Sequence, residues 1–272
     1  MLLQSRDEGR ALAGQLEAMA QGERDELLRG LLLSDLWFML WFGLGRPDAD
    51  HDWCWARCRE VQANPDGYLD LWAREHYKST IITFALTIQD ILRDPEITVG
   101  IFSHTRPNAK GFLSQIKREF EGNQLLRSLF PDILWGNPNK DAPRWAEDTG
   151  IIVRRQGNPK EATVEAWGIV DGQPIGKHFA LMIFDDVVTR DAVGTPEMLA
   201  KVTESWALSL NLGAKGGRKR YIGTRYHAND AYAEIIARQA ATPRVWPAED
   251  EHGVPAFLTR EELLDKRRTM GP

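Results

Sequence analysis

Cysteine is scarce in this chain, which has only Cys54 and Cys58 among 272 residues. A spacing of four places both on one face of a helix, so a disulfide framework is not expected and a reducing cytosol suits the composition. With His51 the pair spells His-x-x-Cys-x-x-x-Cys, which could seed a metal site. No fourth ligand stands nearby, and two free buried thiols are the favoured interpretation.

Long apolar runs are absent as well. No stretch reaches the roughly eighteen apolar residues that a membrane span requires, so no span is predicted. Residues 31–44 are rich in Leu, Trp and Phe, but this segment is short and contains Asp35 and Gly43. Charged residues near the start, among them Arg6 and Asp7, argue against a secretory signal.

The chain has no excess of positive charge. Its 34 Lys and Arg residues are outnumbered by 39 Asp and Glu, which gives a formal net charge of −5. This balance does not indicate a nucleic-acid-binding protein, although one local basic patch would be enough for binding. The densest basic runs are residues 215–220 and the pair Arg154 and Arg155. Each is either such a patch or a solvated loop or strand end.

Hydrophobic periodicity predicts strands that alternate with helices. Residues 1–60 are predicted to be helical. The predicted strands are 68–72, 97–103, 150–155, 161–167, 180–184 and 220–223, of which the third and fourth could form a hairpin. The predicted helices are 79–92, 106–121, 123–129, 230–240 and one that starts at the Thr259–Glu262 capping box.

This alternation predicts an α/β fold with a mainly parallel central sheet flanked by helices. Three parts are expected: a helical N-terminal segment (1–60), a core (61–250) and a C-terminal helix or linker (251–272). Ligands of such sheets bind at the carboxyl ends of the strands. The residues predicted to lie at that edge are Lys78, Ser103, Asp185, Asp186 and Thr224.

Residues 72–80 read Trp-Ala-Arg-Glu-His-Tyr-Lys-Ser-Thr between a predicted strand and a predicted helix. That is the setting of a phosphate-binding loop, G-x-x-x-x-G-K-[ST], with Trp72 and Tyr77 in place of the glycines. Tyr77 is expected to resist the left-handed backbone that glycine adopts freely. The alternative is a solvated Lys78 at the start of a helix.

In the phosphate-loop interpretation, Lys78 reaches the β- and γ-phosphates of ATP while backbone N–H groups of residues 74–79 surround them. The Ser79 hydroxyl would ligate Mg²⁺, and Thr80 would follow it into the helix. Arg74 could touch a phosphate oxygen, or it could simply be an exposed charge. Two further loop residues, Glu75 and His76, have no assignable role, and a general-base role for His76 has little support.

Leu-Met-Ile-Phe-Asp-Asp at residues 181–186 predicts a buried strand that ends in two carboxylates. A strand end buries charge only where something pairs with it. Asp185 could hold Mg²⁺ through water, and Asp186 could polarise an attacking water molecule. The alternative is a helix-capping or loop carboxylate. Together with Lys78, the two acids indicate hydrolysis of a nucleoside triphosphate.

Three segments in this order resemble the large terminase subunits of tailed bacteriophages. They are the loop 72–80, the acidic strand with its preceding Gly-Lys-His (176–186) and Tyr-Ile-Gly-Thr-Arg-Tyr-His-Ala-Asn-Asp (221–230). The resemblance implies a P-loop NTPase of the ASCE, RecA-like class that uses ATP and Mg²⁺ to drive double-stranded DNA into a procapsid. It also implies a portal protein and a small terminase subunit as partners, and the host cytoplasm as location. The family joins this ATPase to a nuclease, and here only the ATPase part is expected, without nuclease activity.

The same resemblance assigns Thr224 and Arg225 to a motif that couples hydrolysis to movement. Rings of this kind use a positive charge donated in trans. Lys177 is the nearest candidate before the acidic strand, while Arg225 could instead sense the γ-phosphate. The chain departs from the family at Tyr77, where glycine is common, and at Asp186, where many related ATPases have glutamate. A monomer with slow turnover is expected in isolation, and a ring when assembled.

Two other functions remain open. A helicase-like ATPase would show hydrolysis stimulated by nucleic acid without any capsid partner. A degenerate docking module would bind ATP, or nothing, and would hydrolyse none, since Trp72 and Tyr77 are poor residues for a phosphate loop.

Overall fold

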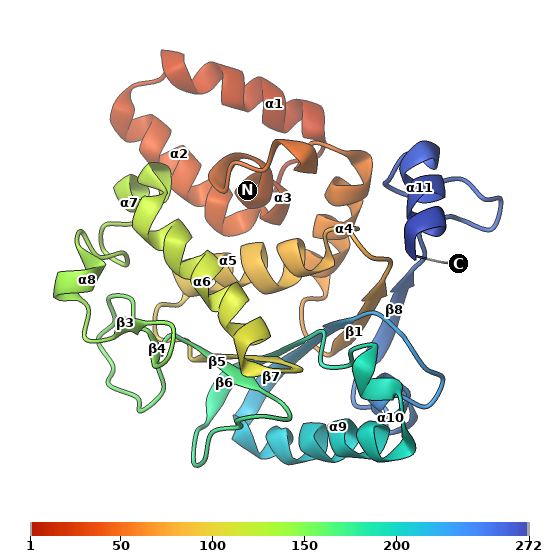
Figure 1. Ribbon diagram of the computed structural model, residues 1–272. Helices are drawn as coiled ribbons and strands as arrows, with labels where there is room; N and C mark the ends of the chain where they lie inside the picture. The colour runs from red at the N-terminus through yellow and green to blue at the C-terminus, as the bar shows by residue number, and fades with distance from the viewer. Residues whose placement is uncertain (1, 271–272) are drawn as a thin grey trace.

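The computed structural model describes residues 2–270 and has an α/β fold. One eight-stranded sheet has the order β3-β4-β5-β2-β6-β7-β1-β8. Within this order, the six strands β5, β2, β6, β7, β1 and β8 are parallel to one another. The two remaining pairs, β3 with β4 and β4 with β5, are antiparallel. The prediction of a mainly parallel sheet flanked by helices is confirmed (Figure 1).

The strands are β1 Tyr68–Trp72, β2 Val99–Ser103, β3 Trp145–Ala146, β4 Gly150–Ile151, β5 Val164–Gly168, β6 Phe179–Asp185, β7 Gly213–Gly223 and β8 Thr242–Trp246. The α-helices are α1 Arg6–Gln15, α2 Gln21–Ser34, α3 Leu36–Phe38, α4 Asp52–Ala63, α5 Leu86–Arg93, α6 Arg106–Gly122, α7 Gln124–Leu129, α8 Pro138–Asp141, α9 Pro196–Ser209, α10 Ala231–Ala237 and α11 Arg260–Met270. Short 3₁₀ or π turns are η1 Leu16–Ala18, η2 Met39–Gly43, η3 Pro47–Ala49, η4 Thr80–Ala85, η5 Asp191–Val193 and η6 Leu210–Leu212. None of the helices in the described part is long and apolar enough to cross a membrane.

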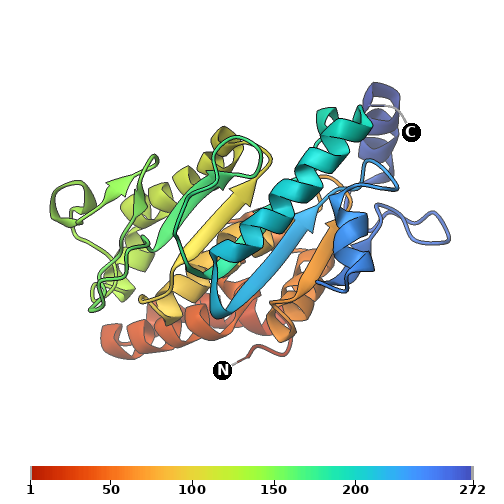
Figure 2. The same cartoon turned by 90° about the horizontal axis from the view of Figure 1, so that it is seen from below.

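The sheet is covered on both faces. On one face lie α5 and α6, behind which the N-terminal helices α1 to α4 form a further layer (Figure 1). On the other face α9 runs alongside the strands, with α10 beside it (Figure 2). Phe184 and Tyr221 stack at 4.9 Å within the second core. Since parallel strands covered on both faces bury all their side chains, β6 is apolar until its terminal carboxylates.

The helical N-terminal segment is confirmed, with a break that the sequence pattern did not predict. Asp35 ends α2 and caps α3, because its side chain accepts a hydrogen bond from the Phe38 backbone N–H. Its carboxylate also forms an ion pair with Arg59 on α4 at 2.5 Å. Trp37, fully buried, stacks on Trp41 at 4.9 Å. The segment therefore packs through aromatic contacts and one buried acid.

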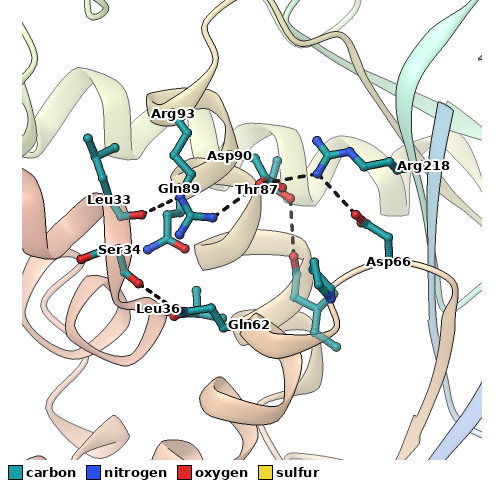
Figure 3. A network of polar contacts seen from close by, with 12 residues as sticks. Leu33, Ser34, Leu36, Gln62, Asp66, Thr87, Gln89, Asp90, Arg93 and Arg218 are labelled. Carbon is teal, nitrogen blue, oxygen red and sulfur yellow. Dashed lines mark hydrogen bonds and ion pairs between the residues drawn. The ribbon is translucent and has the colours of Figure 1, made fainter. Parts of the chain in front are cut away.

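A polar network fixes the amino end of the sheet to α5 (Figure 3). Fully buried Arg220 on β7 donates to Asp90 on α5 and to Asp66 before β1, each at 2.7 Å. The more exposed Arg218 also lies 3.3 Å from Asp66. The helix that leaves the β1 loop is thereby tied to the neighbouring strand at its far end.

Several predicted boundaries are wrong for identifiable reasons. β7 begins at Gly213 rather than near residue 220, because a Gly- and Lys-rich stretch that resembles a loop pairs with β6. The suggested hairpin is reduced to one antiparallel pair, Ile151 with Val164, since the polar residues 154–161 leave the sheet. The helix predicted for 230–240 ends at Ala237. Strand β8 was not predicted at all.

The C-terminal helix begins at the predicted capping box: the Thr259 hydroxyl accepts from the Glu262 N–H at 3.2 Å, and the Glu262 carboxylate accepts from the Thr259 N–H at 2.7 Å. This segment returns to the loop that follows β1. Lys266 on α11 forms an ion pair with Glu75 at 2.5 Å. The Phe257 ring lies 5.5 Å from the Tyr77 ring. The last part of the chain thus packs directly on the candidate phosphate loop.

Candidate functional site

The predicted site residues gather at the carboxyl edge of the sheet. Phe102 at the end of β2 pairs with Phe184, so the next residues, Ser103 and Asp185, are neighbours. Asp185 in turn pairs with Ile222, two residues before Thr224. Strand β1, which delivers the loop, lies on the other side of β7. The sheet therefore brings four segments to one edge, as the sequence predicted.

The loop between β1 and the following helix adopts the backbone that its sequence seemed to oppose. Glu75 and Tyr77 have φ values of 62° and 65°, in the left-handed region. The expectation that Tyr77 would resist this backbone is therefore wrong. A non-glycine residue held there costs on the order of 1–3 kcal/mol, and such strain persists only where the surroundings fix it. Here Tyr77 is fixed by Phe257 and by its hydroxyl, which donates to Asp48 at 3.4 Å.

A π-helix, η4, leads from the loop into α5. Such turns carry a wider hydrogen-bond pattern than α-helices and are frequent at functional sites. The turn holds Thr83, which is fully buried and donates its hydroxyl proton to the Asp185 carboxylate. Ser79, at the start of the helix, donates to the other Asp185 oxygen at 3.0 Å. Sequence reasoning identified Ser79 but missed Thr83, whose position depends on the π-turn.

Asp185 is buried completely. Loss of hydration and the neighbouring Asp186 carboxylate raise the pKa of Asp185 to about 7, while the Thr83 and Ser79 hydroxyls and the Lys78 charge oppose the rise. Both of its oxygens are hydrogen-bonded. Since the carboxylate has no cation in direct contact, its ionised form is costly in the free protein.

Asp186 lies one residue beyond the strand in a strained backbone, with φ of 47°. Its N–H donates to the Ile222 carbonyl at 2.9 Å, which fixes the turn. One carboxylate oxygen, Oδ1, is buried without a hydrogen-bond partner. Burial raises the pKa of Asp186, and the positive charges of Lys78 and Arg74 lower it. Asp186 therefore has a buried carboxylate oxygen that is available to accept a hydrogen bond.

Lys78 is buried, and within residues 2–270 its ammonium group makes neither an ion pair nor a hydrogen bond. Its charge acts on both Asp185 and Asp186 without direct contact, so an anion placed beside it would gain a direct partner. Arg74 is exposed and lies 5.0 Å from the centre of the Tyr226 ring, with its guanidinium donating to the Tyr226 hydroxyl. Tyr226 belongs to the 221–230 segment. The loop and that segment are thus in direct contact, which the sequence did not predict.

His76 is buried between two aromatic rings, Trp53 at 5.4 Å and Phe257 at 5.8 Å. Its Nδ1–H donates to the Arg74 carbonyl at 2.7 Å, and its Nε2 is buried without a partner. Burial lowers the pKa of His76, so the neutral ring is favoured. The buried His76 ring anchors the loop to the aromatic residues beneath it. On the exposed side, the ion pair between Glu75 and Lys266 anchors the loop to α11.

The remaining predicted residues lie away from the two acids. Lys177 precedes β6 at the amino edge of the sheet, where it pairs with the buried Glu165 at 2.8 Å. The length of β6 separates it from Asp185 by about 20 Å. Arg225 is exposed and donates to the Ala228 carbonyl at 2.9 Å. Neither residue contacts the acids within this chain, so a charge donated in trans by Lys177 and sensing of the γ-phosphate by Arg225 stay predictions.

A cavity of about 840 Å³ opens beside the loop. The loop side chains Tyr77 and Thr80 form one wall, and the N-terminal and C-terminal segments supply the others. Its other lining residues are Arg46, Asp48, His51, Glu75, Gln115, Phe257, Leu258 and Glu262. The sequence did not predict this cavity, because it exists only where four distant segments meet, one of them α6 through Gln115.

Cys54 and Cys58 are free, buried thiols on the inner side of α4. Burial raises the pKa of the Cys54 thiol to about 12 and that of Cys58 further, so both stay protonated. The His51 ring accepts from the Trp53 N–H at 3.0 Å and caps the helix. No group of three potential metal-ligating side chains is found among residues 2–270.

A scan against protein-family models finds no match, and a search of curated proteins finds no significant match either. The functional assignment therefore depends on the geometry of this edge and on the three motifs.

Proposed function

We propose that this chain is a Mg²⁺-dependent ATPase whose site is the carboxyl edge around Lys78, Asp185 and Asp186. One observation carries the proposal: at the end of a left-handed loop, the largely buried Lys78 makes no hydrogen bond or ion pair, and a buried Asp186 carboxylate oxygen has no hydrogen-bond partner. Each group is unfavourable alone. A triphosphate with its metal would give both the partners that they lack.

The residues present fit Mg-ATP. Lys78 and the loop N–H groups would hold the β- and γ-phosphates, and Ser79 and Asp185 would hold the metal. The metal would neutralise charge on the phosphates. Asp186 would accept a hydrogen bond from the attacking water and so orient it toward the γ-phosphate. The cavity beside Tyr77 and Thr80 adjoins the loop and would receive the nucleoside.

Strand order supports the choice of NTPase class. β7 lies between the loop strand β1 and the acidic strand β6, which is the additional strand expected of an ASCE-type core. The contact from Arg74 to Tyr226 joins the loop to the segment that resembles a coupling motif. The contact favours a motor ATPase over a docking module, whereas a docking module of the same fold would share the strand order. Neither observation separates a DNA-packaging motor from a helicase-like ATPase.

Among motor functions we favour packaging of double-stranded DNA into a procapsid, as the large terminase subunits perform it, on the resemblance of the three motifs. Portal protein and small terminase subunit are then the expected partners. Lys177 is the candidate for a charge donated in trans, whereas Arg225 would instead sense the γ-phosphate. Stimulation of hydrolysis by duplex DNA without strand separation would distinguish packaging from a helicase. Plasmid incubated with the chain and Mn²⁺ should stay supercoiled.

Asp186→Asn tests the catalytic assignment. The substitution removes the carboxylate that orients water but no phosphate contact, so turnover should fall to near background while affinity for ATP persists. Phosphate release and nucleotide titration on the same preparation measure the two quantities. Asp191→Asn, a change of equal chemistry in η5, is the control. Turnover at the native rate in Asp186→Asn would refute the assignment.

A further inference from the structure

A second cavity, of about 850 Å³, lies at the amino edge of the sheet, away from the proposed ATPase site. It is formed where α2, the end of α5 and the loops before β2 and β5 meet. The continuous helix of η4 and α5 starts at the phosphate loop and ends here at Arg93, about 20 Å away. A smaller cavity of about 340 Å³ adjoins it and shares Trp135 and Arg154 as lining residues.

Arginine dominates the larger cavity, which is unusual for a chain with net charge −5. Four arginines and two acids line it: Arg29, Arg93, Arg154, Arg155, Glu96 and Asp132. Both acids are already engaged. Asp132 pairs with Arg29 through two contacts of 2.7 Å. Glu96 accepts hydrogen bonds from two backbone N–H groups of the 156–157 turn, at 2.6 and 3.0 Å. Of the three other guanidinium groups, Arg93 makes only a long ion pair with Asp90 at 4.0 Å, and Arg155 interacts with the Glu96 charge without direct contact.

These three groups are oriented by neutral partners. Arg155 donates to the Glu161 carbonyl at 2.7 Å, yet its Nη1 is buried without a partner. Arg93 donates through Nε to the Leu33 carbonyl at 2.5 Å, and its nearest acid, Asp90, is 4.0 Å away (Figure 3). Arg154 is exposed and lies over the Trp135 ring at 4.8 Å. Each side chain is held in place while donor atoms remain free.

We propose that this cavity binds phosphate groups of a nucleic-acid backbone through Arg93, Arg154 and Arg155. A planar guanidinium donates two parallel hydrogen bonds to a phosphate, and groups held in advance lose little entropy on binding. Duplex DNA offers one negative charge per about 1.7 Å of axis, so neighbouring arginines can each meet a phosphate. The choice of nucleic acid as the ligand rests on the proposed function. The positive charge of the cavity, which favours a phosphate ligand, is independent of that function.

The test measures binding of a short fluorescent DNA duplex to the full chain by anisotropy over a range of salt concentrations. The variant Arg154→Gln with Arg155→Gln should bind at least tenfold more weakly. Its plot of log affinity against log salt should be shallower by about 1.8, for two lost phosphate contacts. Arg238→Gln, just after α10, removes an exposed arginine elsewhere; it is the control and should leave both quantities unchanged. Matching thermal unfolding of all three proteins excludes a folding defect.

Pyrophosphate titrated in parallel distinguishes the source of the phosphate. If pyrophosphate binds in a manner that the double variant loses and duplex DNA does not bind, the phosphate site stands and the nucleic-acid ligand is rejected. Equal affinity and equal salt slope for native protein and double variant, toward both ligands, would overturn the proposal. ATP hydrolysis measured on the same proteins separates this result from the proposed function, because neither arginine lies at the ATPase site.

Discussion

The buried carboxylate of Asp185 should destabilise the free protein, and Asp185→Asn should relieve that cost. An ordinary aspartate titrates near 3.9, whereas burial and Asp186 raise the pKa of Asp185 to about 7. Between about pH 4 and 7 the folded state holds a proton that the unfolded chain has released, so stability falls as pH rises through that window. At about 1.36 kcal/mol per pKa unit, the full cost above pH 7 is on the order of 4 kcal/mol.

The assay is urea unfolding of native protein and Asp185→Asn at pH 5 and pH 8, without nucleotide or metal. Asparagine keeps the size of the side chain and an oxygen that accepts from Ser79 or Thr83, but it does not ionise. The same pKa shift predicts that titration of Asp185 lowers the free energy of unfolding of the native protein by on the order of 2–3 kcal/mol between pH 5 and pH 8. The variant should show no such loss. Comparing the two proteins cancels all groups that titrate alike in both.

Asp70→Asn is the matched control, because Asp70 is equally buried in a strand but is paired with Arg244 at 2.6 and 2.8 Å. Breaking this pair leaves a buried guanidinium and should destabilise by about 3–5 kcal/mol. A variant at position 185 that is less stable than native protein at pH 8, or that keeps the native pH dependence, would refute the reasoning.

Two further predictions concern the loop and its anchor. Tyr77→Gly should retain the affinity for nucleotide, whereas Tyr77→Val should bind at least tenfold more weakly, because a β-branched residue opposes the left-handed backbone. Equal affinities of the two variants by calorimetry would show that the loop does not need this backbone. Arg220→Met should destabilise the fold by about 3–5 kcal/mol, since Asp90 would stay buried without its partner, while Arg218→Met, at a partly exposed position, should cost under about 1 kcal/mol by urea unfolding.

Much of the carboxyl edge of the sheet was predictable because the sequence patterns that mark its strands and loops are local. Strand β1 was predicted with its observed bounds, and the apolar run that ends in Asp185 and Asp186 placed β6 within a residue or two. Helices α5, α6 and α10 were predicted, whereas α9 lies in a segment, residues 190–210, that was expected to mix loop and helix. Parallel topology then brought the strand ends together without any further information.

What the sequence could not provide depends on distant contacts. Strand β8 contains Pro243, which is tolerated because β8 is an edge strand, and its Arg244 is explained only by Asp70 across the pair. The left-handed Tyr77 opposes local preference and is held by Phe257, 180 positions later in the chain. The π-turn that carries Thr83 to Asp185 has no sequence signature in this chain.

Nucleotide titration calorimetry on Lys78→Ala tests the central claim most directly. A non-hydrolysable ATP analogue with Mg²⁺ should bind the native chain, and the variant should lose about 1.5–3 kcal/mol, or roughly ten- to a hundredfold in affinity, because a charge-assisted phosphate contact is removed. Lys140→Ala, an exposed lysine on α8, should bind as the native chain does. Unchanged affinity in Lys78→Ala would contradict the account and place any nucleotide site elsewhere.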